Sequence, residues 1–314
     1  MIKLLLQKNN IMPSSAYHQF FLGILLQNNQ YIKEVYNKQI GMMYDKKSRE
    51  LSILFGNEYD WYTDTGLKIE GFIIENSWDM VGNGLPDHLP DLIREKLSMS
   101  FYVKYSGDIY YIQGSYAYKE KHLWTDIFMV GYDENGFIAV GKTKKALVEE
   151  YYISEEEVVA SAIKREGLDI YNPYTYNFEL NFYQLLEKPY TLDLKKIKTL
   201  LMKYLNPKYN ERYCMGVDVY SQLLTDWEKE RFRVDQLLYI CDHVCLMRKR
   251  IDEISQCVAI PIEVVSLYYA IEKEMTNIAH EATKPDMWNK ELLNQFQKIL
   301  IYEQQVLKSL VEVM

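Results

Sequence analysis

The pattern of apolar residues changes near residue 190, and this change constrains the fold more than any other feature of the sequence. Before that point, short β-prone runs alternate with turn signals such as "SGD" and "DENG". After it, apolar residues recur about every 3.6 positions through several long runs, a pattern typical of packed helices. We therefore expect an α+β N-terminal domain over residues 1–190 and an all-helical domain over residues 191–314.

Within the first domain, an antiparallel sheet is predicted, because turn signals separate its β-prone runs. The clearest hairpin joins residues 126–132 to residues 137–140 around "DENG". Helices are expected at about residues 15–27 and from Pro90 onward. A third helix should begin after Ser154, since Glu157 follows three residues later as in a capping box.

The overall charge excludes some classes of partner. The chain of 314 residues has a net charge of -8. Protein surfaces that bind nucleic acids carry dense positive charge, and anionic membranes also attract positively charged protein surfaces. No apolar run approaches the roughly 20 residues that span a bilayer. The four cysteines follow no disulfide framework. We expect a cytoplasmic protein with reduced thiols, without nucleic-acid or membrane partners.

Two motifs match chemical signatures only formally. Residues 136–143, "GFIAVGKT", fit the P-loop expression, but the four residues between the glycines are bulky and β-prone, which favours a strand over a phosphate-binding loop. In "CDHVC", Cys241 and Cys245 lie one helical turn apart, with His243 pointing to another, charged part of the helix surface. Structural zinc needs four converging ligands. We therefore predict no metal and no cofactor.

Two histidines remain as candidates for chemistry. His18 lies on the opening helix, where packing or a local hydrogen bond explains it. His122 lies just before the predicted hairpin, in "KHLWTDIFMVGYD". An imidazole at the start of a strand that faces a helix N-terminus is the arrangement of a Cys–His pair, in which the imidazole takes the thiol proton.

Three stretches resemble the butirosin biosynthesis protein H family. They are "SSAYHQFFLGILLQNNQYIKEVYNKQIGMMYD", "YYIQGSYAYKEKHLWTDIFMVGYDENGFIAVG" and "CMGVDVYSQLLTDWEKERFRVDQLLYICDHVCLMRKRIDEI". The resemblance implies a papain-like (bacteriocin-peptidase-like) N-terminal domain with an active-site helix at its start. It also implies acyl transfer in thiotemplated natural-product biosynthesis: a cysteine takes an acyl group from a carrier-protein thioester and passes it to a small-molecule amine, forming an amide.

The resemblance also implies site residues, and here the sequence departs from the family pattern. The cysteine position falls on Ala16, with Ser15 as the alternative. His122 is the expected base, although the family histidine also aligns with Thr125. Asp126, next to that position, is the expected orienting carboxylate. Two explanations of Ala16 are open: a cysteine-to-alanine change in an active enzyme, or a natural member that binds without chemistry.

Alternatives to the acyltransferase follow from these departures. One is a non-catalytic binding or assembly protein, which uses the same cleft or its C-terminal helices to hold a peptide, a carrier domain or a second copy of itself as a homodimer. Another is a cysteine peptidase or amidase, which uses the same site with water as acceptor. An acidic carrier protein predicts a basic docking patch, for which residues 247–250, "MRKR", and residues 195–198, "KKIK", are the candidates.

Overall fold

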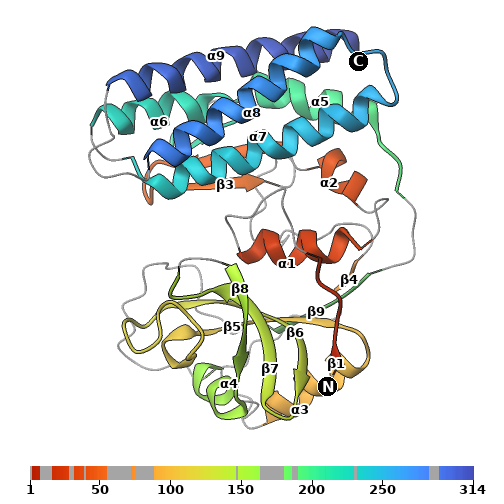
Figure 1. Cartoon of the computed structure of the whole chain (residues 1–314), viewed down its shortest axis with the longest axis vertical. Helices are drawn as coiled ribbons and strands as arrows, with labels where there is room; N and C mark the ends of the chain where they lie inside the picture. The colour runs from red at the N-terminus through yellow and green to blue at the C-terminus, as the bar shows by residue number, and fades with distance from the viewer. Residues whose placement is uncertain are drawn as a thin grey trace. The chain divides into compact units, whose positions relative to one another are not determined.

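The computed structural model describes residues 2–7, 16–27, 32–38, 40–54, 72–74, 88–145, 148–162, 180–185, 190–208, 210–229, 232–282 and 290–314. These residues form an α+β structure with an antiparallel sheet in the N-terminal part and a helical C-terminal region, as predicted (Figure 1). The chain divides into two compact units. Unit 1 contains Met1–Asn28 and Glu70–Lys188, and unit 2 contains Asn29–Ile69 and Pro189–Met314.

An antiparallel sheet forms the centre of unit 1. Its described strands run in the order β4-β9-β5-β6-β7-β8, and β1 pairs with β6 beside this path. Their bounds are β1 (Ile2–Lys3), β4 (Phe72–Ile74), β5 (Tyr102–Asp108), β6 (Trp124–Asp133), β7 (Gly136–Lys142), β8 (Val148–Ile153) and β9 (Leu180–Leu185). The helices of this unit are α1 (Ala16–Leu25), α3 (Leu89–Ser98), the short 3-10 helix η2 (Ile109–Tyr111) and α4 (Glu155–Ala162).

The opening helix α1 lies on β6 and β7 and is held there by aromatic side chains. Phe20 and Phe21 are both buried, and each packs on Phe128 of β6 and Tyr183 of β9. Alternate residues of the strands face the other way and form a second apolar cluster with α3 and α4. The β-prone alternation in the sequence thus places apolar side chains on both faces of this sheet.

Two local predictions in unit 1 are confirmed. The "DENG" hairpin joins β6 to β7, and Asp133 pairs with Gly136, whose φ of +128° favours glycine. The capping box at α4 is formed, since the Glu157 amide donates to Ser154 Oγ at 3.2 Å and the Ser154 amide to Glu157 at 2.8 Å. The P-loop match lies in β7, as the β-prone residues indicated. Its backbone amides pair with β6 and β8.

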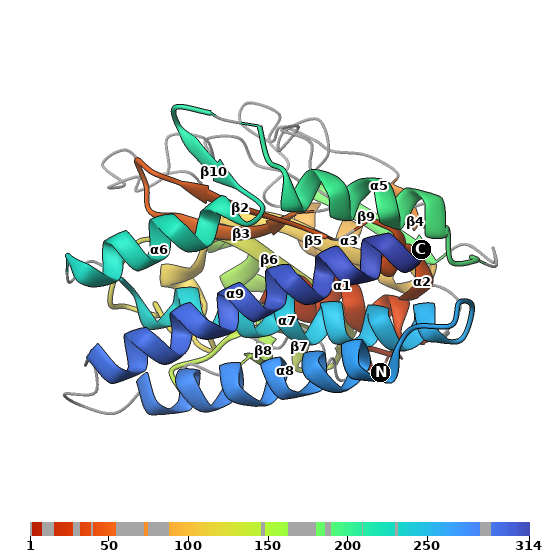
Figure 2. The same ribbon diagram turned by 90° about the horizontal axis from the view of Figure 1, so that it is seen from above.

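Unit 2 combines a three-stranded sheet with helices. The strands are β2 (Gly41–Asp45), β3 (Glu50–Leu54) and β10 (Tyr213–Met215), in the order β10-β2-β3. The helices are α2 (Ile32–Lys38), α5 (Leu194–Leu205), α6 (Asp218–Glu228), α7 (Val234–Ser255), α8 (Ile262–Ala282) and α9 (Lys290–Val313). Helix α8 packs against both α7 and α9 (Figure 2), while α5, α6 and α7 contact the strands.

Residues 29–69 belong with the C-terminal helices, so the structure does not divide at a single boundary near residue 190. The reason is long-range pairing. Tyr213 of β10 pairs with Asp45 of β2, and the Tyr44 hydroxyl donates to Asp226 of α6. The predicted all-helical domain therefore contains a small sheet, two strands of which come from the first sixty residues of the chain.

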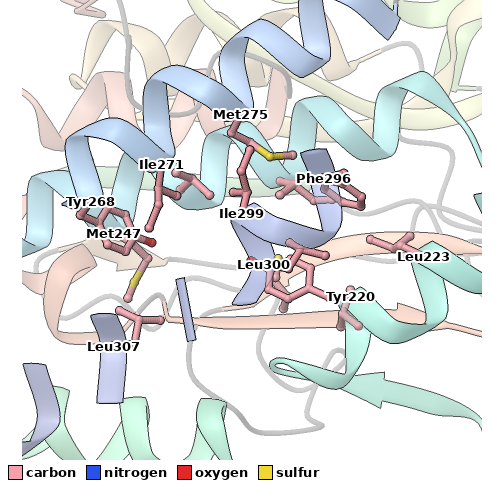
Figure 3. Packing of buried hydrophobic residues seen from close by; sticks show 14 of the residues in the cluster. Tyr220, Leu223, Met247, Tyr268, Ile271, Met275, Phe296, Ile299, Leu300 and Leu307 are labelled. Atoms are coloured by element: carbon pink, nitrogen blue, oxygen red, sulfur yellow. The ribbon is translucent and has the colours of Figure 1, made fainter. Parts of the chain in front are cut away.

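The core of unit 2 joins side chains from the helices α5, α6, α7, α8 and α9 and from the strands β2 and β3, part of which Figure 3 shows. The labelled residues are Tyr220, Leu223, Met247, Tyr268, Ile271, Met275, Phe296, Ile299, Leu300 and Leu307. The apolar period seen in the sequence therefore corresponds to buried helix faces. Among the described residues, no helix is long and apolar enough to cross a membrane.

A polar cluster is buried in the same core. The Glu303 carboxylate accepts hydrogen bonds from the Tyr220 hydroxyl and, at 2.7 Å, from the Tyr268 hydroxyl. His243 Nε2 lies 3.6 Å from Glu303, and Tyr204 stacks on the His243 ring at 5.2 Å. The prediction that His243 lies on a charged part of the helix surface is wrong, because its side chain is fully buried.

Candidate active site

The predicted nucleophile position stands at the start of a helix. Ala16 is the first residue of α1, in the turn whose backbone N–H groups have no acceptor within the helix itself. Ser15 and the side chains of residues 16–18, including His18, lie outside the described residues. The structure therefore places Ala16 by its backbone alone, on the helix that packs against β6 and β7 of unit 1.

His122, the predicted base, forms a close pair with a carboxylate. Its Nδ1 lies 2.7 Å from Asp108 Oδ2. His122 is 41% exposed, whereas the Asp108 side chain is only 1% exposed. Strand pairing brings the two together, because Asp108 at the end of β5 faces Trp124 at the start of β6. The imidazole can therefore meet a ligand while its carboxylate partner stays away from solvent.

The surroundings of Asp108 determine which nitrogen of His122 is available. Asp108 Oδ1 accepts the backbone N–H groups of Tyr110 at 3.1 Å and Leu123 at 3.0 Å, leaving Oδ2 for the imidazole. An ionised carboxylate only accepts hydrogen bonds, so Nδ1 is the donor in a neutral His122. Nε2 then carries the lone pair and can accept a proton from a reacting group.

An aromatic ring fixes the orientation of the imidazole further. Tyr110 stacks on His122 with ring centroids 4.0 Å apart, and Tyr111 lies at 5.9 Å. Both tyrosines belong to η2, which Asp108 caps by accepting the Tyr110 amide. The "DIYYIQG" run reads as β-prone in sequence, but residues 109–111 form this 3-10 helix, which turns the chain away from β5 and toward His122.

The other two predicted positions lie further along β6 and do not bond to His122. Asp126 Oδ1 lies 3.3 Å from Lys104 Nζ and accepts the Ser106 hydroxyl at 3.2 Å. Thr125 pairs with Gly107 in the strand ladder. The carboxylate that holds the imidazole is thus Asp108, and Asp126 instead neutralises a lysine that is only 3% exposed.

The sequence also contains a signal for Asp108, which lies in the pairing of β6 with β5 and not in the "DENG" hairpin. Strand β6 has two neighbours, β7 across the "DENG" turn and β5 across a longer connection. "SGDIYY" contains an aspartate at the end of a β-prone run, and antiparallel pairing of that run with residues 124–129 brings it to the histidine.

Neither metal ligation nor the existing thiols offer an alternative centre in the described part of the chain. There, no three His, Cys, Asp or Glu side chains gather as metal ligands would. Burial raises the pKa of Cys214, and burial together with neighbouring carboxylates raises the pKa of Cys241 and Cys245 to about 12. Such thiols are protonated at neutral pH and are poor nucleophiles.

These thiol pKa values predict an order of alkylation. At pH 8 a thiol of pKa about 12 is ionised in roughly one molecule in ten thousand, so Cys241 and Cys245 should react with iodoacetamide far more slowly than the exposed Cys257. Peptide mass spectrometry over a time course measures this order. Labelling of the three cysteines at equal rates in the folded protein would contradict the described burial.

No protein-family model matches the chain, and no curated protein matches it.

Proposed function

We propose that the protein is built as a papain-like acyltransferase that moves an acyl group from a carrier-protein thioester to an amine. The observation that carries this proposal is the His122–Asp108 pair, in which a buried carboxylate holds Nδ1 of a half-exposed imidazole. The pair leaves Nε2 able to accept a proton, which a base in acyl transfer has to do. The butirosin biosynthesis protein H resemblance supplies the donor and acceptor classes.

The chemistry requires a cysteine at position 16. His122 Nε2 would take the proton of the cysteine thiol, the thiolate would attack the thioester carbonyl carbon, and the carrier thiolate would leave with that proton from the imidazolium, giving an acyl-enzyme and a neutral His122. The amine would then attack the acyl carbon, His122 Nε2 would accept the amine proton, and the cysteine would leave as the new amide forms. Backbone N–H groups at the start of α1 would stabilise the oxyanion, and no nucleotide is required.

The alanine at position 16 favours a second candidate, a binding protein of the same architecture. Alanine cannot form an acyl-enzyme, so the covalent route is closed in the chain as it stands. As a surface for a partner, the terminal helix α9 is less available than the sequence indicated, because Phe296 and Leu307 pack inside unit 2. Ile301 and Tyr302 stay exposed on that helix and could still contact a second copy.

Installing cysteine tests the proposal directly. The Ala16→Cys protein should form a covalent acyl adduct when it is mixed with an acyl-loaded carrier protein, and it should transfer the acyl group to an added amine. Intact mass spectrometry follows both steps. The unchanged Ala16 protein should form no adduct, and Ala16→Cys combined with His122→Ala should transfer far more slowly, because no base accepts the amine proton.

Three outcomes of this experiment decide between the candidates. An adduct that passes to the amine supports the acyltransferase. An adduct that is lost only to water supports the peptidase or amidase, in which water is the acceptor. If a correctly folded Ala16→Cys protein forms no adduct with any thioester, the acyltransferase proposal is wrong and the binding protein is favoured.

A further inference from the structure

The segment that leads into His122 is folded against the end of β7. The Gln113 amide donates to Glu157 of α4 at 2.6 Å, and the Tyr116 amide donates to the Lys142 carbonyl at 3.1 Å. The Lys119 amide donates to the carbonyl of Tyr110, the residue that stacks on His122. Residues 113–121 are thereby fixed beside the imidazole and beside the β7–β8 connection.

This fold gathers lysines around two tyrosine rings. Lys119 and Lys144, which are far apart in the sequence, both lie over the Tyr118 ring, at 5.1 Å and 5.8 Å from its centroid. Lys121 lies over Tyr116 at 5.6 Å. We define the lysine rim as the five exposed lysines of this region: Lys119, Lys121, Lys142, Lys144 and Lys145.

The charge of the lysine rim differs in sign from that of the chain. Lys144 lies 3.7 Å from Glu120, and Lys145 lies 3.8 Å from Glu149. Five lysines thus outnumber the two carboxylates that pair with them, in a chain whose net charge is -8. Such a local excess of positive charge attracts a negatively charged partner and repels a positively charged one.

The basic stretches that the sequence predicted for docking are less suitable. In "MRKR", Arg250 is fully buried and donates to the Tyr36 carbonyl at 2.7 Å. Arg248 is paired with Asp252 and Glu272. The prediction of a surface patch at residues 247–250 is therefore wrong. "KKIK" lies on α5 in unit 2, which does not contain His122.

We propose that the lysine rim is the docking surface for a folded acidic protein, which it holds next to His122. The identity of this partner as the acyl-loaded carrier rests on the proposed function. Acidic side chains of the partner would meet the rim ammonium groups, which the half-buried Tyr116 and Tyr118 rings hold in place from beneath. An acyl arm anchored beside the rim starts next to His122, since Lys121 is its neighbour in the chain.

Charge reversal tests the docking surface without requiring catalysis. We expect the Lys119→Glu/Lys144→Glu protein to bind an acidic acyl carrier protein about tenfold more weakly than the unchanged chain, because rim charges govern encounter between proteins. The measurement is fluorescence anisotropy of labelled carrier, at low and at high salt. The difference should shrink at high salt, since exposed charges are screened.

The control makes the same change of charge elsewhere. Lys195→Glu/Lys198→Glu on α5 should change the carrier Kd by less than about twofold. The docking surface would be overturned by any of three results. Both pairs of substitutions could weaken carrier binding equally, or the unchanged protein could fail to bind the carrier. It could also bind an oligonucleotide of similar charge as tightly as the carrier. Docking without an acyl adduct on the Ala16→Cys protein would leave the lysine rim supported and the proposed function wrong.

Discussion

Replacing Asp108 by asparagine in the Ala16→Cys protein should slow acyl transfer to an amine by about 10²–10⁴-fold. Asparagine can still accept the Tyr110 and Leu123 amides through its oxygen, so the connection should stay folded. Its NH₂ group would face Nδ1 of His122 and donate to it. That reverses the tautomer and leaves a proton on Nε2, where the reaction needs a lone pair. Single-turnover kinetics from the isolated acyl-enzyme measure the loss.

Two further substitutions make this test specific. Asp133→Asn at the exposed "DENG" turn removes a carboxylate of the same sheet, and it should leave the rate within about twofold. Asp126→Asn should destabilise unit 1 through Lys104 without a comparable loss of rate in the folded fraction. If Asp126→Asn slows acyl transfer and Asp108→Asn does not, Asp126 and not Asp108 is the carboxylate that orients the His122 imidazole.

The second large effect concerns the buried cluster of unit 2. Glu303→Ala should lower the free energy of unfolding by about 3–5 kcal/mol. The substitution leaves a cavity and removes the acceptor for two tyrosine hydroxyls that have no exposure to water, those of Tyr220 and Tyr268. Urea denaturation, followed by far-UV circular dichroism, measures the change.

A second background protein separates the cost of the cavity from the cost of the lost hydrogen-bond acceptor. In a Tyr220→Phe/Tyr268→Phe protein, no hydroxyl depends on Glu303, so the further cost of Glu303→Ala should be clearly smaller. Tyr302→Ala, at an exposed residue next to Glu303 on α9, should cost less than about 0.5 kcal/mol. A loss below about 1 kcal/mol for Glu303→Ala would show that the cluster contributes little to stability.

Local signals in the sequence predicted the elements well. The Ser154–Glu157 capping box and the "DENG" turn depend on residues within four positions of each other, so the sequence specifies them directly. The placement of β2 and β3 in unit 2 depends instead on β10, which lies more than 150 positions further along the chain. Periodicity describes one face of one element, and it does not say which distant strand covers it.

The candidate site shows the same limit. His122 could be selected because its position before a β-prone run is visible in the sequence. Asp108 could not be selected with the hairpin alone, because its register with β6 passes through the connection that contains η2. His243 was misplaced for a related reason: its charged neighbours along the chain indicated a surface, while the Glu303 and Tyr204 side chains that enclose it come from other helices.

The chain passes between its two units three times, and this order has a consequence for biosynthesis. Strands β2 and β3 leave the ribosome early, but their partner β10 and the helices that cover them follow more than 150 residues later. At about 5–20 residues per second, that interval lasts roughly ten seconds or more. Unit 1 can close once β9 has emerged, while residues 29–69 still await their partners. Strands β2 and β3 can pair with each other at once, but the other edge of "GMMYD" stays open until β10 has been made, and an open strand edge can pair with other chains.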